Sequence, residues 1–361
     1  MPETTEDVVK KCPNCGSALV FSPQDGTLKC PACGHVAEAQ EDSDSIASYE
    51  NDLCSLIDRE DLVETPEAIT IKCPACGAES RLPDNVVADE CPYCKNPIVA
   101  SDKTVKSIRP QGVVPFSIDR GEASEIFGRW IKGLWFAPGS IKGARLHESL
   151  KGTYSPTWTF DFKTRCTYTG KRGTEYQETI QHTSNGKTTT RTVTRVSWRS
   201  VSGVVYNEFD DILVPASSML CGKAMDSVEN WRLDGAVDYA QDKIRGFTEL
   251  SYDLPLKSGL EKAKAKASPT IEKTIRRDIG GDRQKISSMD VSYTGLTFRQ
   301  ILLPYWTSRY RHGGKDYEFM VNGQNGKAGG TRPWSAAKIA LACIAAAALL
   351  ALLLMIIASL E

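Results

Sequence analysis

Eight of the twelve cysteines stand in four Cys-x-x-Cys pairs near the start of the chain. The first two pairs form a quartet with C-x2-C-x14-C-x2-C spacing, and the last two repeat that spacing 61 residues later. The eight residues are Cys12, Cys15, Cys30, Cys33, Cys73, Cys76, Cys91 and Cys94. Zinc prefers four thiolates in a tetrahedron, which two tight turns brought together by a hairpin supply. The spacing therefore predicts two zinc ribbons, each holding one Zn²⁺ ion.

The residues around the cysteines favour a metal site over a redox site. The motifs CPNCG, CPACG, CPACG and CPYCK place proline where φ must be about −65° and, in three cases, glycine where a left-handed residue is easiest. A thioredoxin-type site needs a single pair at a helix start, whereas these pairs come in matched couples. Four thiolates close the zinc coordination shell, so we expect both ions to be structural. His35 is then a solvent-exposed residue and not a ligand.

Charge is strongly segregated along the 361 residues, although the net charge is only −1. Residues 1–103 hold 20 acidic against 8 basic side chains, and the remainder holds 25 against 36. An acidic surface repels phosphates, which disfavours nucleic acid as a ligand of the ribbons and favours a basic protein surface. The start MPETTEDVVKK has no apolar stretch of a secretory signal, so we expect a reducing compartment.

The pattern predicts an α+β protein in five segments. They are zinc ribbon 1 over 1–38, an acidic linker over 39–71, zinc ribbon 2 over 72–103, a cytoplasmic α+β domain over 104–331 and a C-terminal membrane anchor over 332–361. In the linker, Ile46, Tyr49, Leu53 and Ile57 have helical spacing. This predicts a short amphipathic helix that either packs on the ribbons or docks a partner. Cys54 beside it is interpreted as a buried apolar residue.

The membrane anchor rests on 22 uncharged residues over 339–360, about 33 Å of helix. Lys327, Arg332 and Lys338 precede this run, and only Glu361 follows it. Because positive flanks stay inside, we expect a single-pass, tail-anchored protein of a bacterial inner membrane, with residues 1–338 in the cytoplasm. Trp334 then lies at the interface with the lipid bilayer.

In the middle domain, Asp119 with Glu122 three residues later predicts a helix start. Its apolar face is expected to pack in the core and consists of Ile126, Phe127, Trp130, Ile131, Leu134 and Trp135. Strand-like runs from Tyr154 and Ser202 flank a hairpin turn at residues 185–186, Asn-Gly. Period-two geometry places Lys187, Arg191, Arg195 and Arg199 on one face of this hairpin. That face is either solvated or in contact with anionic lipid or the acidic ribbons.

A second helix is predicted over 256–279, with Leu260, Ala263, Ala267, Ile271 and Ile275 on one face. Pro269 is expected to break or kink it, and the glycines at 280 and 281 to end it. Short strands punctuated by glycines at 313–314 and by 322–323 then predict a terminal β-hairpin leading to the anchor.

The sequence gives no support for an enzyme. His147, His182 and His312 are far apart and lie in none of the common catalytic motifs, and Cys166 and Cys221 lack a nucleophile context. Asp210 and Asp211 are interpreted as solvated turn residues. Residues 186–188 mimic the end of a phosphate-binding loop, but residue 181 is glutamine where that loop needs glycine. We expect no catalytic residues and no nucleotide site.

The order of these parts resembles a bacterial family of membrane-anchored zinc-ribbon proteins. The resemblance rests on the four cysteine motifs, then PFSID, YSPTW, LLPYW and VNGQNGKAGGTRPWSAAKI ahead of the terminal span. Members are labelled TFIIB-type zinc ribbon proteins or primosomal protein N′-like, replication factor Y helicase-like. Some are encoded beside PspA and SPFH-domain proteins, so the resemblance implies recruitment of a partner at the membrane. This chain has no motor motifs that would match the helicase label.

Three functions follow as hypotheses. The leading one is a zinc-binding, tail-anchored adaptor that recruits a cytoplasmic protein partner, of the PspA-like or SPFH-domain kind by resemblance. The alternative is a membrane-tethered nucleic-acid-binding protein of replication or transcription, which would use the arginine-rich hairpin. A third is a zinc or thiol-stress sensor.

Overall fold

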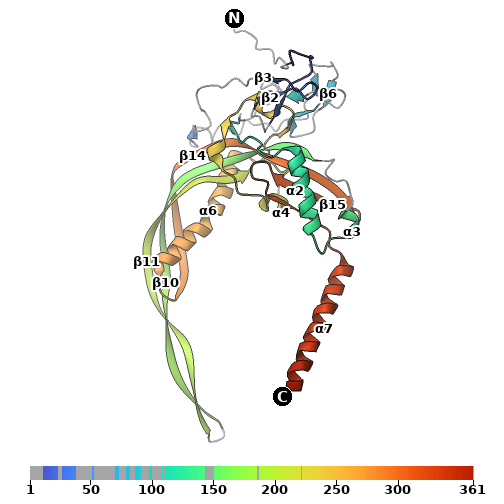
Figure 1. Ribbon diagram of the computed structural model, residues 1–361. Helices are drawn as coiled ribbons and strands as arrows, with labels where there is room; N and C mark the ends of the chain where they lie inside the picture. The colour runs from blue at the N-terminus through green and yellow to red at the C-terminus, as the bar shows by residue number, and fades with distance from the viewer. Residues whose placement is uncertain are drawn as a thin grey trace.

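The computed structural model describes residues 11–22, 27–37, 51–52, 70–72, 79–81, 86–90, 97–99, 108, 110–142, 150–184, 187–220 and 222–360. In these residues the fold is α+β, as predicted: a large mixed sheet, small sheets near the N-terminus and an apolar helix near the C-terminus (Figure 1).

Three long strands form the centre of the large sheet. β10 (Lys151–Ser184) pairs antiparallel with both β11 (Lys187–Pro215) and β14 (Arg283–His312). Ser184 lies opposite Lys187, so the predicted hairpin about residues 185–186 is confirmed. The pairing with β14 ends at Gly173, opposite Arg283. Beyond it, β10 and β11 continue as a two-stranded arm that curves away from the body (Figure 1).

Shorter strands extend this sheet on both sides. β9 (Gly112–Val113) and β12 (Val237–Asp238) lie beyond β14, as does the β15 (Lys315–Asn322) and β16 (Ala328–Gly330) pair. β13 (Thr248–Leu250) runs parallel to β10 and pairs with β7 (Val86–Glu90), which pairs with β8 (Pro97–Val99). Segment 72–103 therefore contributes two strands to the large sheet.

The predicted terminal hairpin is confirmed between β14 and β15, where Gly313 and Gly314 have φ of 58° and 76°. Two consecutive left-handed residues match the twist of paired strands, and glycine adopts that conformation without strain. The expectation of short strands was wrong for β14, which has 30 residues. The strand is long because residues 283–307 pair with β10, a partner far away in sequence.

The linker prediction is corrected where the structure describes it. Residues Asn51 and Asp52 form β4, which pairs antiparallel with β14. They are extended and not helical, because β14 offers them a free strand edge. The apolar positions of the predicted helix, Ile46, Tyr49, Leu53 and Ile57, and the neighbouring Cys54 lie outside the described residues.

Helix α2 (Arg120–Gly133) begins where the sequence predicts. Asp119 caps it, because Oδ1 of Asp119 accepts a hydrogen bond of 2.8 Å from the backbone N–H of Glu122. Phe127 and Ile131 are buried as expected. Trp135 was expected on the same face but is 76% exposed, because the helix ends at Gly133 and the chain turns before α3 (Gly139–Lys142).

Helix α6 (Leu256–Ile279) packs along the long strands and buries the five predicted residues of its apolar face. Pro269 does not break it. The proline lies on the exposed side, where water replaces the hydrogen bond that its missing N–H would make. The helix ends at Gly280, which has a φ of 63°. Two single-turn helices, α4 (Lys223–Asp226) and α5 (Gln241–Ile244), and a 3₁₀ turn at Leu233–Gly235 occupy the connections.

A small antiparallel sheet of β1 (Val20–Ser22), β2 (Thr27–Lys29) and β3 (Val36–Ala37) docks on the body. The N–H of Phe21 donates to the carbonyl of Arg245 at 3.1 Å. Phe247 packs against the core of the small sheet and stacks on Phe116 of the body at 4.4 Å. β5 (Thr70–Lys72) and β6 (Glu79–Arg81) form a separate two-stranded sheet.

Helix α7 (Ala336–Leu360) leaves the body at the end where α2 and α3 lie (Figure 1). Its segment Ala336–Ile357 has a mean hydropathy of 3.0 and no buried residue. The described chain thus contains one helix long and apolar enough to cross a membrane, as predicted.

Candidate metal centre

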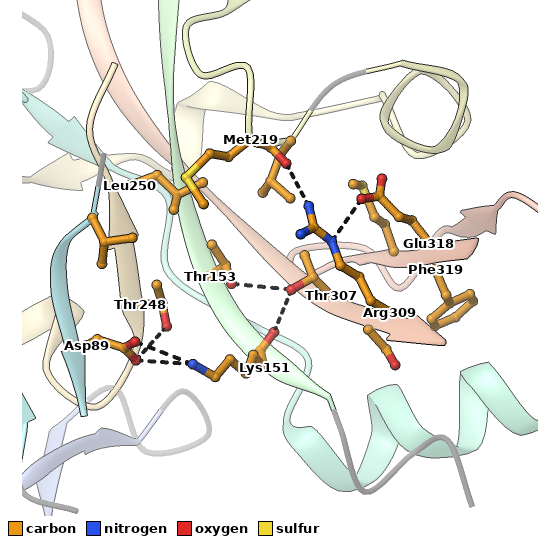
Figure 2. A pocket seen from close by; sticks show the side chains of 14 residues that line it. Asp89, Lys151, Thr153, Met219, Thr248, Leu250, Thr307, Arg309, Glu318 and Phe319 are labelled. Carbon is orange, nitrogen blue, oxygen red and sulfur yellow. Dashed lines mark hydrogen bonds and ion pairs between the residues drawn. The ribbon is translucent and has the colours of Figure 1, made fainter. Parts of the chain in front are cut away.

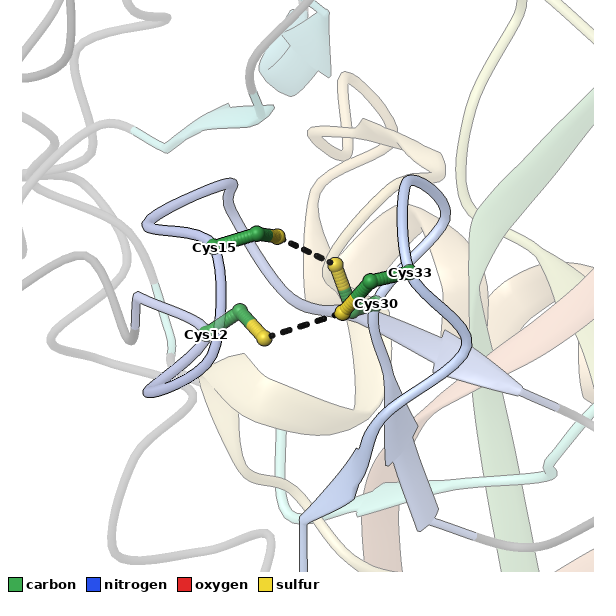
Figure 3. A group of neighbouring side chains, drawn as sticks. All are labelled: Cys12, Cys15, Cys30 and Cys33. Atoms are coloured by element: carbon green, nitrogen blue, oxygen red, sulfur yellow. Dashed lines mark hydrogen bonds between the residues drawn. The ribbon is translucent and has the colours of Figure 1, made fainter.

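The first cysteine quartet converges at one point of the small N-terminal sheet (Figure 3). The Sγ atoms of Cys12 and Cys33 are 3.5 Å apart, and those of Cys15 and Cys30 are 3.4 Å apart. All four sulfurs lie within 4.8 Å of one another. Cys12 and Cys30 are buried and Cys15 and Cys33 are exposed, so the cluster sits at the surface with one side against the core.

Two turns with the same backbone hydrogen bonds present these sulfurs. In the first turn, the N–H of Gly16 donates to the carbonyl of Cys12 at 2.9 Å. In the second, the N–H of Gly34 donates to the carbonyl of Cys30, also at 2.9 Å. The two glycines have φ of 74° and 75°, which side chains rarely adopt. The glycine of the Cys-x-x-Cys-Gly motif therefore allows each turn to fold back over its first cysteine.

The spacing of the sulfurs fits a tetrahedral metal site. Four sulfurs about 2.3 Å from a central zinc ion would be about 3.8 Å from each other, close to the distances found here. A disulfide would need an S–S distance of about 2.05 Å, and all four cysteines are free. His35 contributes no ligand to the group; its Nδ1 lies 3.4 Å from Nδ2 of Asn14. Four thiolates can thus hold a metal ion here.

Hydrogen bonds give Cys15 and Cys33 of this cluster different pKa values. The backbone N–H and then the hydroxyl of Ser17 lower the pKa of Cys15 to about 6. The backbone N–H of His35 lowers the pKa of Cys33, but the thiol of Cys12 and partial desolvation outweigh it and raise this pKa to about 12. Cys15 therefore becomes a thiolate, the form that binds metal ions, at lower pH than Cys33.

The second quartet, Cys73, Cys76, Cys91 and Cys94, lies outside the described residues, as does Cys221. The strands around it are described, and each of its two cysteine pairs lies in sequence between antiparallel strands, although these two strand pairs belong to different sheets. β5 precedes the first pair in sequence and β6 follows it, and the two strands pair antiparallel. β7 and β8 bracket the second pair in the same way, as β2 and β3 bracket Cys30 and Cys33.

A carboxylate group that the sequence did not reveal lies in the middle of the large sheet. Asp210 and Asp211 are not turn residues: they stand within β11 at a β-bulge, and their carboxylates approach that of Asp161 on β10. The N–H of Asp211 donates to Asp161, and Arg299 on β14 forms an ion pair with Asp211. The hairpin turn predicts that β10 and β11 pair, but it does not indicate where a bulge interrupts their register. Arg299 offsets part of the negative charge of the three carboxylates.

A cavity of about 380 Å³ lies between β7 and the body. Figure 2 shows its charged side chains already engaged: Lys151 pairs with Asp89 at 3.4 Å. Arg309 pairs with Glu318 at 2.9 Å and donates to the carbonyl of Met219 at 3.3 Å. The hydroxyl of Thr248 also donates to Asp89, at 3.0 Å. These contacts tie β7 to the body.

The remaining candidate residues of the sequence lie apart. Arg191, Arg195 and Arg199 share one face of the arm, as predicted, and it is the face that α6 covers nearer the body. Arg195 pairs with Glu178. Cys166 is buried beneath α6, where burial raises the pKa of its thiol and keeps it unreactive. His147 and the side chains of His182 and Lys187 are outside the described residues.

Comparisons with known proteins give a relative without a described activity. The chain is 26% identical, over 337 residues, to a protein of Bacillus subtilis (strain 168) described as the uncharacterized protein YdjG. The match covers 91% of both chains, so the similarity extends over nearly the whole length of each. No family model matches the chain, and no solved structure matches it.

Proposed function

We propose that the chain is a zinc-binding membrane adaptor, which holds a cytoplasmic protein partner at the inner face of a bacterial inner membrane. The observation that carries this proposal is the convergence of four free thiols in a surface cluster of tetrahedral size. Four thiolates in a tetrahedral set suit Zn²⁺, and the second quartet repeats the cysteine spacing. A metal ion whose four coordination positions are all filled by thiolates stabilises the fold and has no open position for a reaction. Such a site suits a module that docks a partner.

The apolar helix supports the membrane part of the proposal. The body buries none of the apolar segment Ala336–Ile357, and such a surface is unfavourable in water and favourable in a bilayer. The basic residues ahead of the helix favour a cytoplasmic body. The resemblance to membrane-anchored zinc-ribbon proteins suggests a PspA-like or SPFH-domain partner.

A pull-down from detergent extract tests the adaptor. The variant combines Cys12→Ser with Cys73→Ser, which removes one ligand from each quartet, and Cys343→Ser in α7 is the matched control. We expect the double variant to stay in the membrane fraction and lose its partner, while the control keeps it. If the wild type and the double variant capture the same proteins, the quartets are not the docking surface.

A second candidate function uses the arm. Arg172 lies opposite Arg199 where α6 ends, and both side chains are exposed at the base of the projecting two-stranded ribbon. Such a ribbon can enter a nucleic-acid groove, and its cations would bind phosphates. A gel-shift titration at about 50 mM salt tests this alternative. Binding lost in the Arg191→Ala, Arg195→Ala, Arg199→Ala variant would favour it, and no shift of the wild type would exclude it.

A further inference from the structure

The base of α7 is fastened to the loop between α2 and α3. The N–H of Ser335 donates to the carbonyl of Phe136 at 2.8 Å. Nζ of Lys338 donates to the carbonyls of Trp135 and Ala137, at 3.2 and 2.7 Å. The side chain of Lys338 thus binds the loop at the first turn of α7, so loop and helix start lie at the same level.

The loop is itself rigid. Leu134, Ala137 and Ile141 are buried against Tyr310 of β14, and the hydroxyl of Tyr310 donates to the carbonyl of Thr331 at 3.1 Å. The chain that leads into α7 and the loop beside it are therefore held by one cluster. The first turn of α7 is therefore held beside this cluster.

Two large aromatic side chains remain outside this cluster. Trp135 is 76% exposed and Trp334 is 58% exposed. Phe136 and Trp334 lie beside each other, with ring centroids 6.3 Å apart, and the guanidinium of Arg332 lies 4.5 Å from the Trp334 ring. An exposed tryptophan costs free energy in water, but at the boundary of a bilayer its ring meets both acyl chains and headgroups.

We propose that the loop 134–138 is a second membrane contact, in which Trp135 inserts into the headgroup region of the bilayer beside the base of α7. This proposal rests on the membrane span in the proposed function. If α7 enters the bilayer near Lys338, the hydrogen bonds to Lys338 bring the loop to the bilayer surface. Trp135 and Trp334 then form a two-point aromatic contact, and Arg332 and Lys338 lie where anionic headgroups are concentrated.

Quenching of tryptophan fluorescence by brominated lipid tests this contact. The full chain is reconstituted into phosphatidylcholine and phosphatidylglycerol vesicles whose acyl chains carry bromine close to the headgroup. Four proteins are compared: the wild type, Trp135→Phe, Trp334→Phe and the control Trp198→Phe, which removes a half-buried tryptophan of the long sheet. Flotation of the vesicles reports separately whether each protein is in the membrane.

We expect Trp135→Phe to remove about half of the quenchable fluorescence, since two tryptophans share the interface, and Trp198→Phe to remove none. The loop contact is wrong if all four proteins float with the vesicles and only Trp334→Phe reduces quenching. If the wild type does not float, the span itself fails, and the loop contact fails with it. The two failures are therefore distinguishable.

Discussion

At the scale of single residues, a few buried polar contacts join neighbouring elements and shift the pKa of the side chains that make them. Tyr168 on β10 is the clearest: its hydroxyl donates to Oδ2 of Asp278 on α6 at 2.6 Å. Burial, followed by the hydrogen bond and the charge of Asp278, raises the pKa of Tyr168 to about 12. The contact ties the last turn of α6 to the point where the arm begins.

Replacement of Tyr168 by phenylalanine should lower the free energy of unfolding at neutral pH. It should also make this free energy fall less steeply as the pH rises into the alkaline range. The pKa of Tyr168 is higher in the folded than in the unfolded chain, so the stabilisation is complete below pH 10 and is lost as pH rises toward 12. We expect Tyr168→Phe to lower the free energy of unfolding by about 1–2 kcal/mol at pH 7. Urea unfolding at pH 7 to 11 measures this. An unchanged pH dependence in the variant would show that another group is responsible.

At the scale of elements, local sequence patterns correctly predicted the helices that short-range interactions form. The N-cap signal at Asp119 predicted the start of α2. The spacing of about four residues between small and apolar side chains predicted α6. The continuous length of β10 and β14 could not be read in the same way, since their pairing joins residues more than a hundred positions apart. The carboxylates of Asp161 and Asp211 meet at a bulge in the β10–β11 pairing, and the hairpin signal in the sequence does not indicate where that bulge lies.

The first quartet shows the same contrast between features that follow from local sequence and features that depend on contacts with distant segments. Its four ligands followed from spacing alone, because two short turns and one hairpin determine the cluster. The docking of the small sheet through Phe21 and Phe247 could not be predicted, because nothing in either segment marks its partner.

Two glycine-to-alanine changes in or beside helices should act in opposite directions. Gly128 lies within α2 with open space around it, so Gly128→Ala should raise the free energy of unfolding by about 0.5–1 kcal/mol. Gly281 follows α6 with a φ of 75°, and a Cβ there would lie 2.8 Å from the carbonyl oxygen of Gly173. Gly281→Ala should therefore destabilise the chain. Thermal unfolding of both variants checks the signs; two shifts of the same sign would contradict the assignment.

At the scale of the whole molecule, the acidic first part of the chain and the basic remainder are joined in the described residues. The small cysteine sheet docks through Phe247, and β7 adds to the large sheet through β13. The cluster at Leu134 and Tyr310 fixes the base of α7. The small cysteine sheet is thus connected through the body to the helix proposed to cross the bilayer.

Phe247 is the residue whose loss should uncouple the cysteine sheet from the body. Its ring stacks on Phe116 and contacts Tyr154, and it also packs on the sheet. Phe247→Ala should cost about 3 kcal/mol or more and leave the first quartet able to bind metal. Limited proteolysis should then release the N-terminal segment faster than in the wild type. Equal cleavage rates in wild type and variant would mean that other contacts hold the sheet.

The metal content of the purified full-length chain tests the central claim most directly. Elemental analysis should find two equivalents of zinc per chain, one fewer in Cys12→Ser, and two in the control Cys343→Ser. Fewer than one equivalent in the wild type, or a content that Cys12→Ser does not change, would contradict the account.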